Sequence, residues 1–184
     1  MADEKFKRPT DVSTTNSAEE IPEVEMDPRK YEMYLQKIRE EQNLVNGIMG
    51  GAIAALVGGG VWAGVTVLSG WQIGWMAIGI GFIVGYAIRT FGKGMDMSFG
   101  VSGAALSLVG CLAGNLFTIV YYIGEESGMP IGEVFSILDM NTTIEMMLET
   151  FAPMDLLFYG LALYYGYKYS FRVITHEEMV KLRK

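Results

Sequence analysis

The sequence predicts an all-α integral membrane protein: a four-helix bundle with short interfacial amphipathic helices and a disordered N-terminal tail. Three observations support this class. Residues 46–88 contain no charged side chain, and this length allows two bilayer crossings of about 20 residues each. Two further apolar stretches follow, at residues 101–123 and 153–174. All fourteen Lys and Arg residues lie in the N-terminal region, beside the middle one of the three connections, or in the region from the end of the last apolar stretch to the C-terminus.

The polar N-terminal region divides into a tail and a helix. Residues 1–27 have few apolar side chains to bury, which predicts a disordered cytoplasmic tail. Asp27 and Pro28 are typical of a helix start, with Asp as the N-cap and Pro in the first turn. Residues 28–45 are therefore expected to form a juxtamembrane amphipathic helix, which lies on the lipid surface or extends the first crossing. A partner-binding helix is the alternative.

The first two crossings, residues 47–68 and 71–91, are expected to form a tight hairpin that turns at Ser69 and Gly70. Both carry small residues at helical spacing. Helices in lipid associate mainly through close packing, which small side chains permit. We therefore predict that these positions pack helix against helix within one chain, with contact between subunits as the alternative. They are Gly47, Gly51, Ala54 and Gly58, with a second patch at Gly60 and Gly64, on the first crossing, and Gly74, Gly81, Gly85 and Gly92 on the second.

The third crossing, residues 101–123, combines small residues with one carboxamide. Asn115 lies near mid-depth, where hydrocarbon offers no hydrogen-bonding partner. We expect its side chain to bond a neighbouring helix; the alternative is that it lines a polar cavity. The small residues of this crossing are Gly103, Ser107, Gly110, Gly114 and Thr118.

The connection at residues 125–152 is predicted to be an exoplasmic helical loop. It has no Lys or Arg and shows two apolar patterns of helical spacing, the first after Pro130. Thr142 and Glu145 match a capping box at the start of the second. The fourth crossing, residues 153–174, opens at Pro153 with Asp155 in its first turn, where the helix dipole favours negative charge. Residues 175–184 follow as a basic tail.

The distribution of basic residues predicts the orientation. With four crossings, all fourteen fall on one side, and the positive-inside rule then places both termini in the cytoplasm. The outer side carries seven acidic residues and no base, which accounts for the formal net charge of −7. We interpret these acids as the solvated faces of short helices; a cation site is the alternative.

No catalytic, cofactor-binding or metal-ligating residues are predicted, and nothing indicates nucleic-acid binding. Residues 100–103 read GVSG and superficially match the GxSG pattern of intramembrane serine proteases. The only histidine, His176, follows the last crossing and leaves Ser102 without a base at membrane depth. The single cysteine, Cys111, excludes an intramolecular disulfide and a multi-cysteine metal site. The chain is therefore not expected to be an enzyme.

Two segments resemble a known group of proteins. They are GWMAIGIGFIVGYAIRTFGKG, residues 74–94, and PMDLLFYGLALYYGYKYSFR, residues 153–172. They are similar to an uncharacterised family of small bacterial four-pass inner-membrane proteins, and the resemblance covers roughly residues 46–174. It implies a location in the bacterial inner (plasma) membrane and carries no activity or functional residues. Some similar proteins have a cysteine-rich zinc ribbon before the membrane part, where this chain has an acidic tail.

We therefore expect a non-enzymatic membrane protein that acts as an accessory subunit or an oligomeric scaffold. Its expected partners are the lipid bilayer and a membrane protein or further copies of itself. The alternative is a small oligomeric channel or transporter with a pore near Asn115.

The orientation is testable with reporter fusions at Gly70, Gly94, Asp139 and Lys184. Fusions at Gly94 and Lys184 should report the cytoplasm, because the basic residues flank these points. Fusions at Gly70 and Asp139 should report the outer side. An exoplasmic signal from the Lys184 fusion would contradict the predicted topology.

Overall fold

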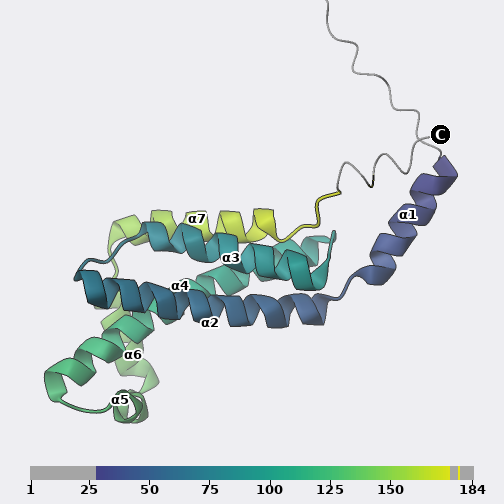
Figure 1. Cartoon of the computed structure of the whole chain (residues 1–184). Helices are drawn as coiled ribbons and strands as arrows, with labels where there is room; N and C mark the ends of the chain where they lie inside the picture. Colours follow the sequence, from purple (N-terminus) through teal and green to yellow (C-terminus); the bar gives the residue numbers. More distant parts are fainter. Residues whose placement is uncertain (1–27, 175–177, 179–184) are drawn as a thin grey trace, which may run out of the picture.

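A computed structural model describes residues 28–174 and Glu178 of the chain, and all regular structure in this part is α-helical (Figure 1). The predicted all-α class is confirmed. The tails predicted at residues 1–27 and 175–184, with Asp27 and His176, lie outside the described residues, apart from Glu178. The helices are α1 (Pro28–Glu41), α2 (Leu44–Ser69), α3 (Trp75–Gly92), α4 (Met97–Ser127), α5 (Ile131–Ile137), α6 (Met140–Glu149) and α7 (Pro153–Tyr169).

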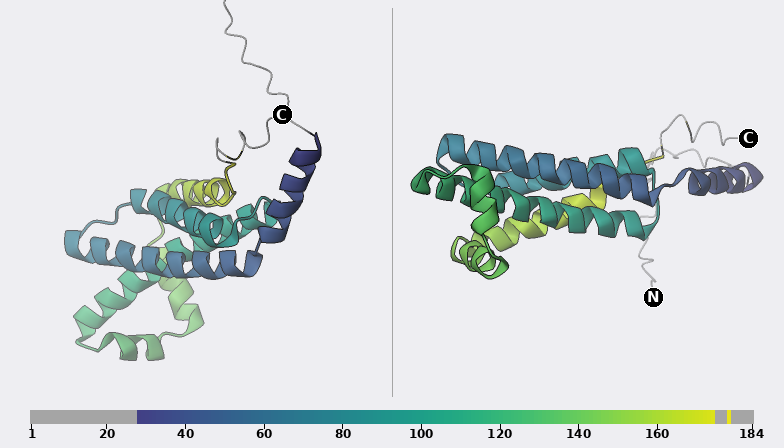
Figure 2. Two further views of the ribbon diagram at one scale, coloured as in Figure 1. Left: turned by 45° about the vertical axis from the view of Figure 1, so that its right-hand side comes forward. Right: turned by 90° about the horizontal axis from the view of Figure 1, so that it is seen from below.

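Four helices, α2, α3, α4 and α7, lie side by side in an elongated body (Figures 1 and 2). α2 packs on α3 and α4, and α7 packs on the same two helices from the other side, while α3 and α4 also touch across the centre. The core between them contains Trp62, Ile80, Val84 and Ile88, each at most 2% exposed. α1 projects from one end of this body, and α5 and α6 lie at the other end.

Three of these helices, α2, α3 and α4, are long and apolar enough to cross a membrane. A fourth span is counted only if α6 and α7 are taken together, and these two helices are bent by 105° at the break between them. The structure is therefore compatible with a multi-pass membrane protein that has three or four spans.

The helix ends differ from the predicted limits of the crossings. Gly70 ends α2 in the left-handed conformation, with φ of 67°, and α3 begins only at Trp75, because the chain needs residues 71–74 to return to the bundle. α4 is longer than predicted at both ends, from Met97 to Ser127. α7 ends at Tyr169, so residues 170–174 are not helical.

The predicted capping box at Thr142 and Glu145 is wrong. α6 begins at Met140, because Asp139 is the N-cap and its carboxylate accepts a hydrogen bond of 2.6 Å from the Thr142 backbone amide. Hydrogen bonds from the Thr142 side chain and, to a smaller extent, from its backbone amide lower the pKa of Asp139. Pro153 begins α7 as expected, and Asp155 in its first turn accepts a bond of 2.9 Å from the Ala152 amide. At the start of α6, Asp139 rather than Thr142 is the N-cap, because a carboxylate just before the first turn can accept a hydrogen bond from a free backbone amide of that turn.

Many of the predicted small positions face another helix at short distance. A Cβ added to Gly81 would lie 2.5 Å from the Ala162 carbonyl oxygen, and one added to Gly103 would lie 2.4 Å from the Gly166 carbonyl oxygen. Such distances are essentially absent between real atoms, so a side chain there would force the helices apart. Similar close approaches, to side chains or to backbone, occur at Gly74, Gly85, Gly92 and Gly110, and a less tight one, of 3.2 Å to the Trp62 Cβ, occurs at Gly114.

The small patch at Gly60 and Gly64 has a different environment. A Cβ at either position would meet no atom within 4 Å, and both residues are exposed on α2. On the same helix Ala55 is 1% exposed, whereas Ala54, the residue named from the spacing, is only half-buried. A 3.6-residue period leaves such neighbouring positions unresolved until the partner helices are placed.

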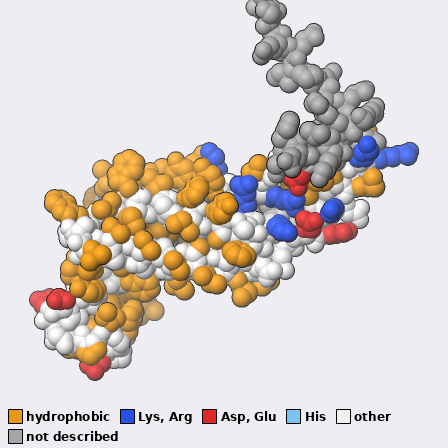
Figure 3. All heavy atoms as spheres, in the orientation of Figure 1, with side chains coloured by type: hydrophobic (Ala, Val, Ile, Leu, Met, Phe, Trp, Pro, Cys, Tyr) orange, Lys and Arg blue, Asp and Glu red, His pale blue; other side chains and the backbone are white. Residues whose placement is uncertain are grey.

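Hydrophobic side chains cover most of the visible surface of the bundle (Figure 3). Lys and Arg gather toward the end next to α1, where acidic side chains also lie, whereas the α5–α6 end shows acidic side chains and no visible base. Large apolar residues such as Ile53, Val57 and Ile83 are at least half exposed. In water this surface would be costly, since about 25 cal/mol of stabilisation is lost per Å² of apolar area left exposed.

A leucine at Gly85 should disturb the contact of α3 with α7. Its Cβ would lie 2.9 Å from the Gly166 carbonyl oxygen and 2.9 Å from the Tyr169 Cβ, and overpacking of this kind typically costs about 1–3 kcal/mol. Gly79→Leu is the matched control on the same helix, because nothing lies within 4 Å of its added Cβ. Melting temperatures in detergent should fall for Gly85→Leu only. Equal melting temperatures for the two variants would contradict the packing role.

Candidate functional site at Asn115

Asn115 joins three segments of the chain through its side-chain amide. Its Oδ1 accepts a hydrogen bond of 3.1 Å from Gln72 Nε2, which lies in the connection before α3. Its Nδ2 donates to the Tyr159 hydroxyl on α7. The predicted bond from Asn115 to a neighbouring helix is therefore present. These three residues are called the polar trio below.

The polar trio lies beside apolar side chains. Tyr159 is 7% exposed and belongs to the hydrophobic core of the bundle. Its hydroxyl and the Asn115 amide satisfy each other, and an unpaired polar group in such surroundings costs about 1–3 kcal/mol in proteins. The hydrogen bonds hold α4 and α7 in one register at this depth.

An apolar pocket of about 380 Å³ lies next to the polar trio. Among its lining residues only Asn115 and Tyr159 carry polar side chains, and none is charged. Phe151 packs on Tyr159 with an edge-to-face ring contact, 6.0 Å between centroids. The remaining lining residues are Leu108 and Leu112 from α4, and Ile144, Met147 and Leu148 from α6. We call this the α6 pocket.

α6 forms the outer wall of this pocket and is held mainly by α4. It packs against α4 and against no other helix of the described chain. The break before Pro153 turns it by 105° from α7. Its apolar residues Ile144 and Leu148 remain 48% and 67% exposed. The wall is therefore a short helix with an incompletely covered apolar face.

The sequence identified one member of the polar trio and missed two. Gln72 is one of two carboxamides in the uncharged stretch 46–88, and that feature was the only signal for it. Nothing in the sequence distinguishes Tyr159 from the other tyrosines of α7, so its bond to Asn115 had no signal. Two of the glycines predicted for helix packing lie on α4 near Asn115 but face away from the pocket. Gly110 faces Ile80 and Ala55, and Gly114 faces Trp62.

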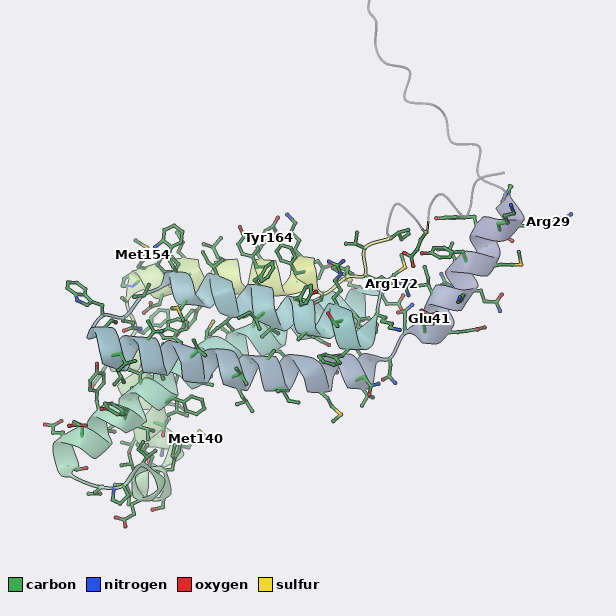
Figure 4. All side chains as sticks on the ribbon, viewed as in Figure 1. Arg29, Glu41, Met140, Met154, Tyr164 and Arg172 are labelled. Carbon is green, nitrogen blue, oxygen red and sulfur yellow. The ribbon has the colours of Figure 1, made fainter. Side chains whose placement is uncertain are left out.

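Polar contacts also join the segments at the opposite end of the bundle. The Arg172 guanidinium lies 2.9 Å from both the Glu41 and the Glu178 carboxylates, and Arg172 and Glu41 approach each other across the gap between α1 and the bundle (Figure 4). The bond from Arg172 lowers the pKa of Glu41. The Arg172 amide donates to the Gly94 carbonyl oxygen at 2.8 Å. The end of α1, the α3–α4 connection and the segment after α7 thus lie together.

Groups typical of catalysis are not assembled in the described part of the chain. No cluster of three His, Cys, Asp or Glu residues there has the spacing to hold a metal ion. Cys111 is fully buried. The arrangement around Asn115 offers an apolar cavity with two hydrogen-bonding groups at one wall, which is typical of binding sites for largely apolar ligands.

Comparisons with known proteins returned no match among family models, curated proteins or solved structures.

The hydrogen bond between Asn115 and Tyr159 should appear as a coupling energy. In a double-mutant cycle with Asn115→Leu and Tyr159→Phe, we expect about 0.6 kcal/mol, with an upper limit of about 1.7, as measured for such bonds between membrane helices. Tyr164→Phe is the control, because Tyr164 lies on the same helix and is 54% exposed. Unfolding in detergent would supply the energies. Additivity within about 0.3–0.5 kcal/mol in both cycles would contradict the coupling.

Proposed function

We propose that the chain is an integral membrane protein that crosses the bilayer four times, through α2, α3, α4 and α7. Three of these helices have the length and composition of spans. α7 has 17 residues, which is at the lower end of the range for a crossing. Support for its crossing comes from its position, because it packs along α3 and α4 over the body of the bundle.

The proposed orientation has both termini in the cytoplasm. Because α2 begins and α7 ends at the same end of the bundle (Figure 1), an even number of crossings is the simplest path. Arg89, Lys93 and Arg172 lie at this end, which fits the positive-inside rule. The resemblance to small bacterial proteins supports the inner membrane as the location. Glycine contacts between the helices would supply the close packing that such a bundle needs in lipid.

Within the membrane, we propose a non-enzymatic accessory role in which the chain binds an apolar segment of a partner subunit. The α6 pocket is the observation that carries this proposal. Its volume of about 380 Å³ lies in the range of binding pockets, and its lining is apolar except at Asn115 and Tyr159. Because α6 packs only on α4 among the described helices, an inserted side chain would displace few contacts between helices.

A channel with a pore near Asn115 is the second candidate, and the geometry favours it less. Both hydrogen-bonding groups of the Asn115 amide are used by Gln72 and Tyr159. The adjoining pocket is apolar, whereas a conducting path needs polar or hydrated walls. An oligomeric scaffold built from copies of this chain remains a form of the association role, with a second copy as the partner.

A photo-crosslinking residue placed at Leu148 tests the association role. Leu148 lines the α6 pocket and is 67% exposed, so a bound partner should be captured in stoichiometric amount from native membranes. The control position is Ile83 on the outer face of α3, which is 50% exposed and should yield lipid adducts. Capture of the same protein at both positions would contradict a specific pocket. Solute flux into proteoliposomes that is abolished by Asn115→Leu would favour the channel instead.

A further inference from the structure

A second pocket, of about 320 Å³, lies at the end of the bundle next to α1. Its lining is polar, unlike that of the α6 pocket, and it is formed by the last two turns of α3 and the segment that follows α7. We call it the basic pocket. Its residues are Tyr86, Arg89, Thr90 and Lys93 from α3 and its end, with Arg172, Val173 and Glu178 from the segment after α7.

The basic pocket carries an excess of positive charge. Three bases and one acid line it, which gives a formal charge of +2. Arg172 is already paired with Glu178 and with Glu41 outside the lining, so one positive charge remains even when Glu41 is included. Arg89 and Lys93 form no salt bridge with the described residues. Within this part of the chain no carboxylate lies at salt-bridge distance from them, so they are the groups that an anion in the pocket would meet.

An aromatic surface begins at the same pocket and runs along the groove between α3 and α7. Phe82 and Tyr86 are stacked with ring centroids 6.4 Å apart. Tyr169 meets Phe82 edge to face at 4.8 Å and stacks on Tyr165 at 5.9 Å. Phe82 and Tyr86 are 46% and 54% exposed. A molecule with its anionic group in the basic pocket would thus find an apolar wall directly beneath it.

We propose that the basic pocket binds the phosphate of an anionic phospholipid, with one acyl chain lying on the aromatic surface. Arg89 and Lys93 supply charge-assisted hydrogen bonds to the phosphodiester oxygens, and basic pockets between membrane helices on the cytoplasmic side recognise such headgroups. The inference rests on the proposed membrane crossing. A free phosphate ester has the same anionic chemistry, but it would make no use of Phe82 and Tyr86.

The test measures lipid binding by the full chain in a zwitterionic detergent. Native mass spectrometry and melting temperature are recorded with phosphatidylglycerol, phosphatidylcholine, water-soluble glycerophosphoglycerol and inorganic phosphate. We expect phosphatidylglycerol to bind about 30-fold better than phosphatidylcholine, since each of the two bases near an anionic lipid contributes about fivefold. Glycerophosphoglycerol and phosphate should raise the melting temperature far less.

The variant is the double substitution Arg89→Gln with Lys93→Gln, which should abolish the preference for phosphatidylglycerol. The matched control is Lys37→Gln with Arg39→Gln, which removes the same two charges from exposed positions on α1 and should keep the preference. Melting temperatures of both double variants equal to that of the wild type without lipid would show that folding is intact. If the melting temperatures differ, the lipid preference in native mass spectra of the folded fraction decides.

Three results would overturn the inference. One is an undiminished preference for phosphatidylglycerol in the Arg89→Gln, Lys93→Gln variant. Another is equal binding of phosphatidylcholine by the wild type, and the third is equal protection by glycerophosphoglycerol, which would identify a soluble phosphate ester as the ligand. Fractionation separates this inference from the proposed function, because a chain that does not sediment with membranes would contradict the membrane crossing itself.

Discussion

The close approach of helix backbones at glycine is the constraint on which the rest of the structure depends. At Gly103 and Gly166, α4 and α7 come so near that neither position has room for a Cβ. The same holds where Gly59 on α2 meets the backbone of α4 at Gly110. Because lipid tails are as apolar as leucine, burial of apolar area gives little drive for helices to associate in a bilayer. Dispersion contacts between closely spaced backbones can supply that drive.

Such packing also explains where the larger side chains lie. Trp62, Ile80 and Ile88 fill the space between the helices, and the glycines opposite them provide the room; a Cβ on Gly110, for example, would lie 2.8 Å from Ile80 Cγ2. The outer faces, by contrast, carry exposed residues such as Ile53 and Leu56. A bundle surrounded by hydrocarbon needs large apolar residues on its outer surface as well as in its core, because the surrounding lipid is as apolar as the core.

Polarity is concentrated at three places, and each performs a separate task in the architecture. The polar trio fixes α4 against α7 within the apolar body. Arg172 ties Glu41, at the end of α1, to the segment after α7. Asp139 caps the start of α6. The two pockets with proposed ligands adjoin the first two of these places, one apolar and one basic.

The sequence by itself determined the helical class and the number of apolar stretches. It also determined where α1 and α7 begin, at Pro28 and Pro153, and where α5 begins to within a few residues. These are local properties: apolar length, proline in a first turn and the spacing of small residues are set by neighbours along the chain. The sequence also identified Asn115, because an isolated amide in an apolar stretch must find a partner. It could not name that partner.

Only the tertiary structure decided that Gln72 and Tyr159 meet Asn115, that Ala55 rather than Ala54 is buried, and that Asp139 rather than Thr142 caps α6. It alone brought Arg89 and Lys93 beside Arg172, which is distant in the sequence. The physical reason is shared by all of them. Helical periodicity specifies a face only to within about one residue, and which faces meet depends on how four helices pack at once, a property that no single segment contains.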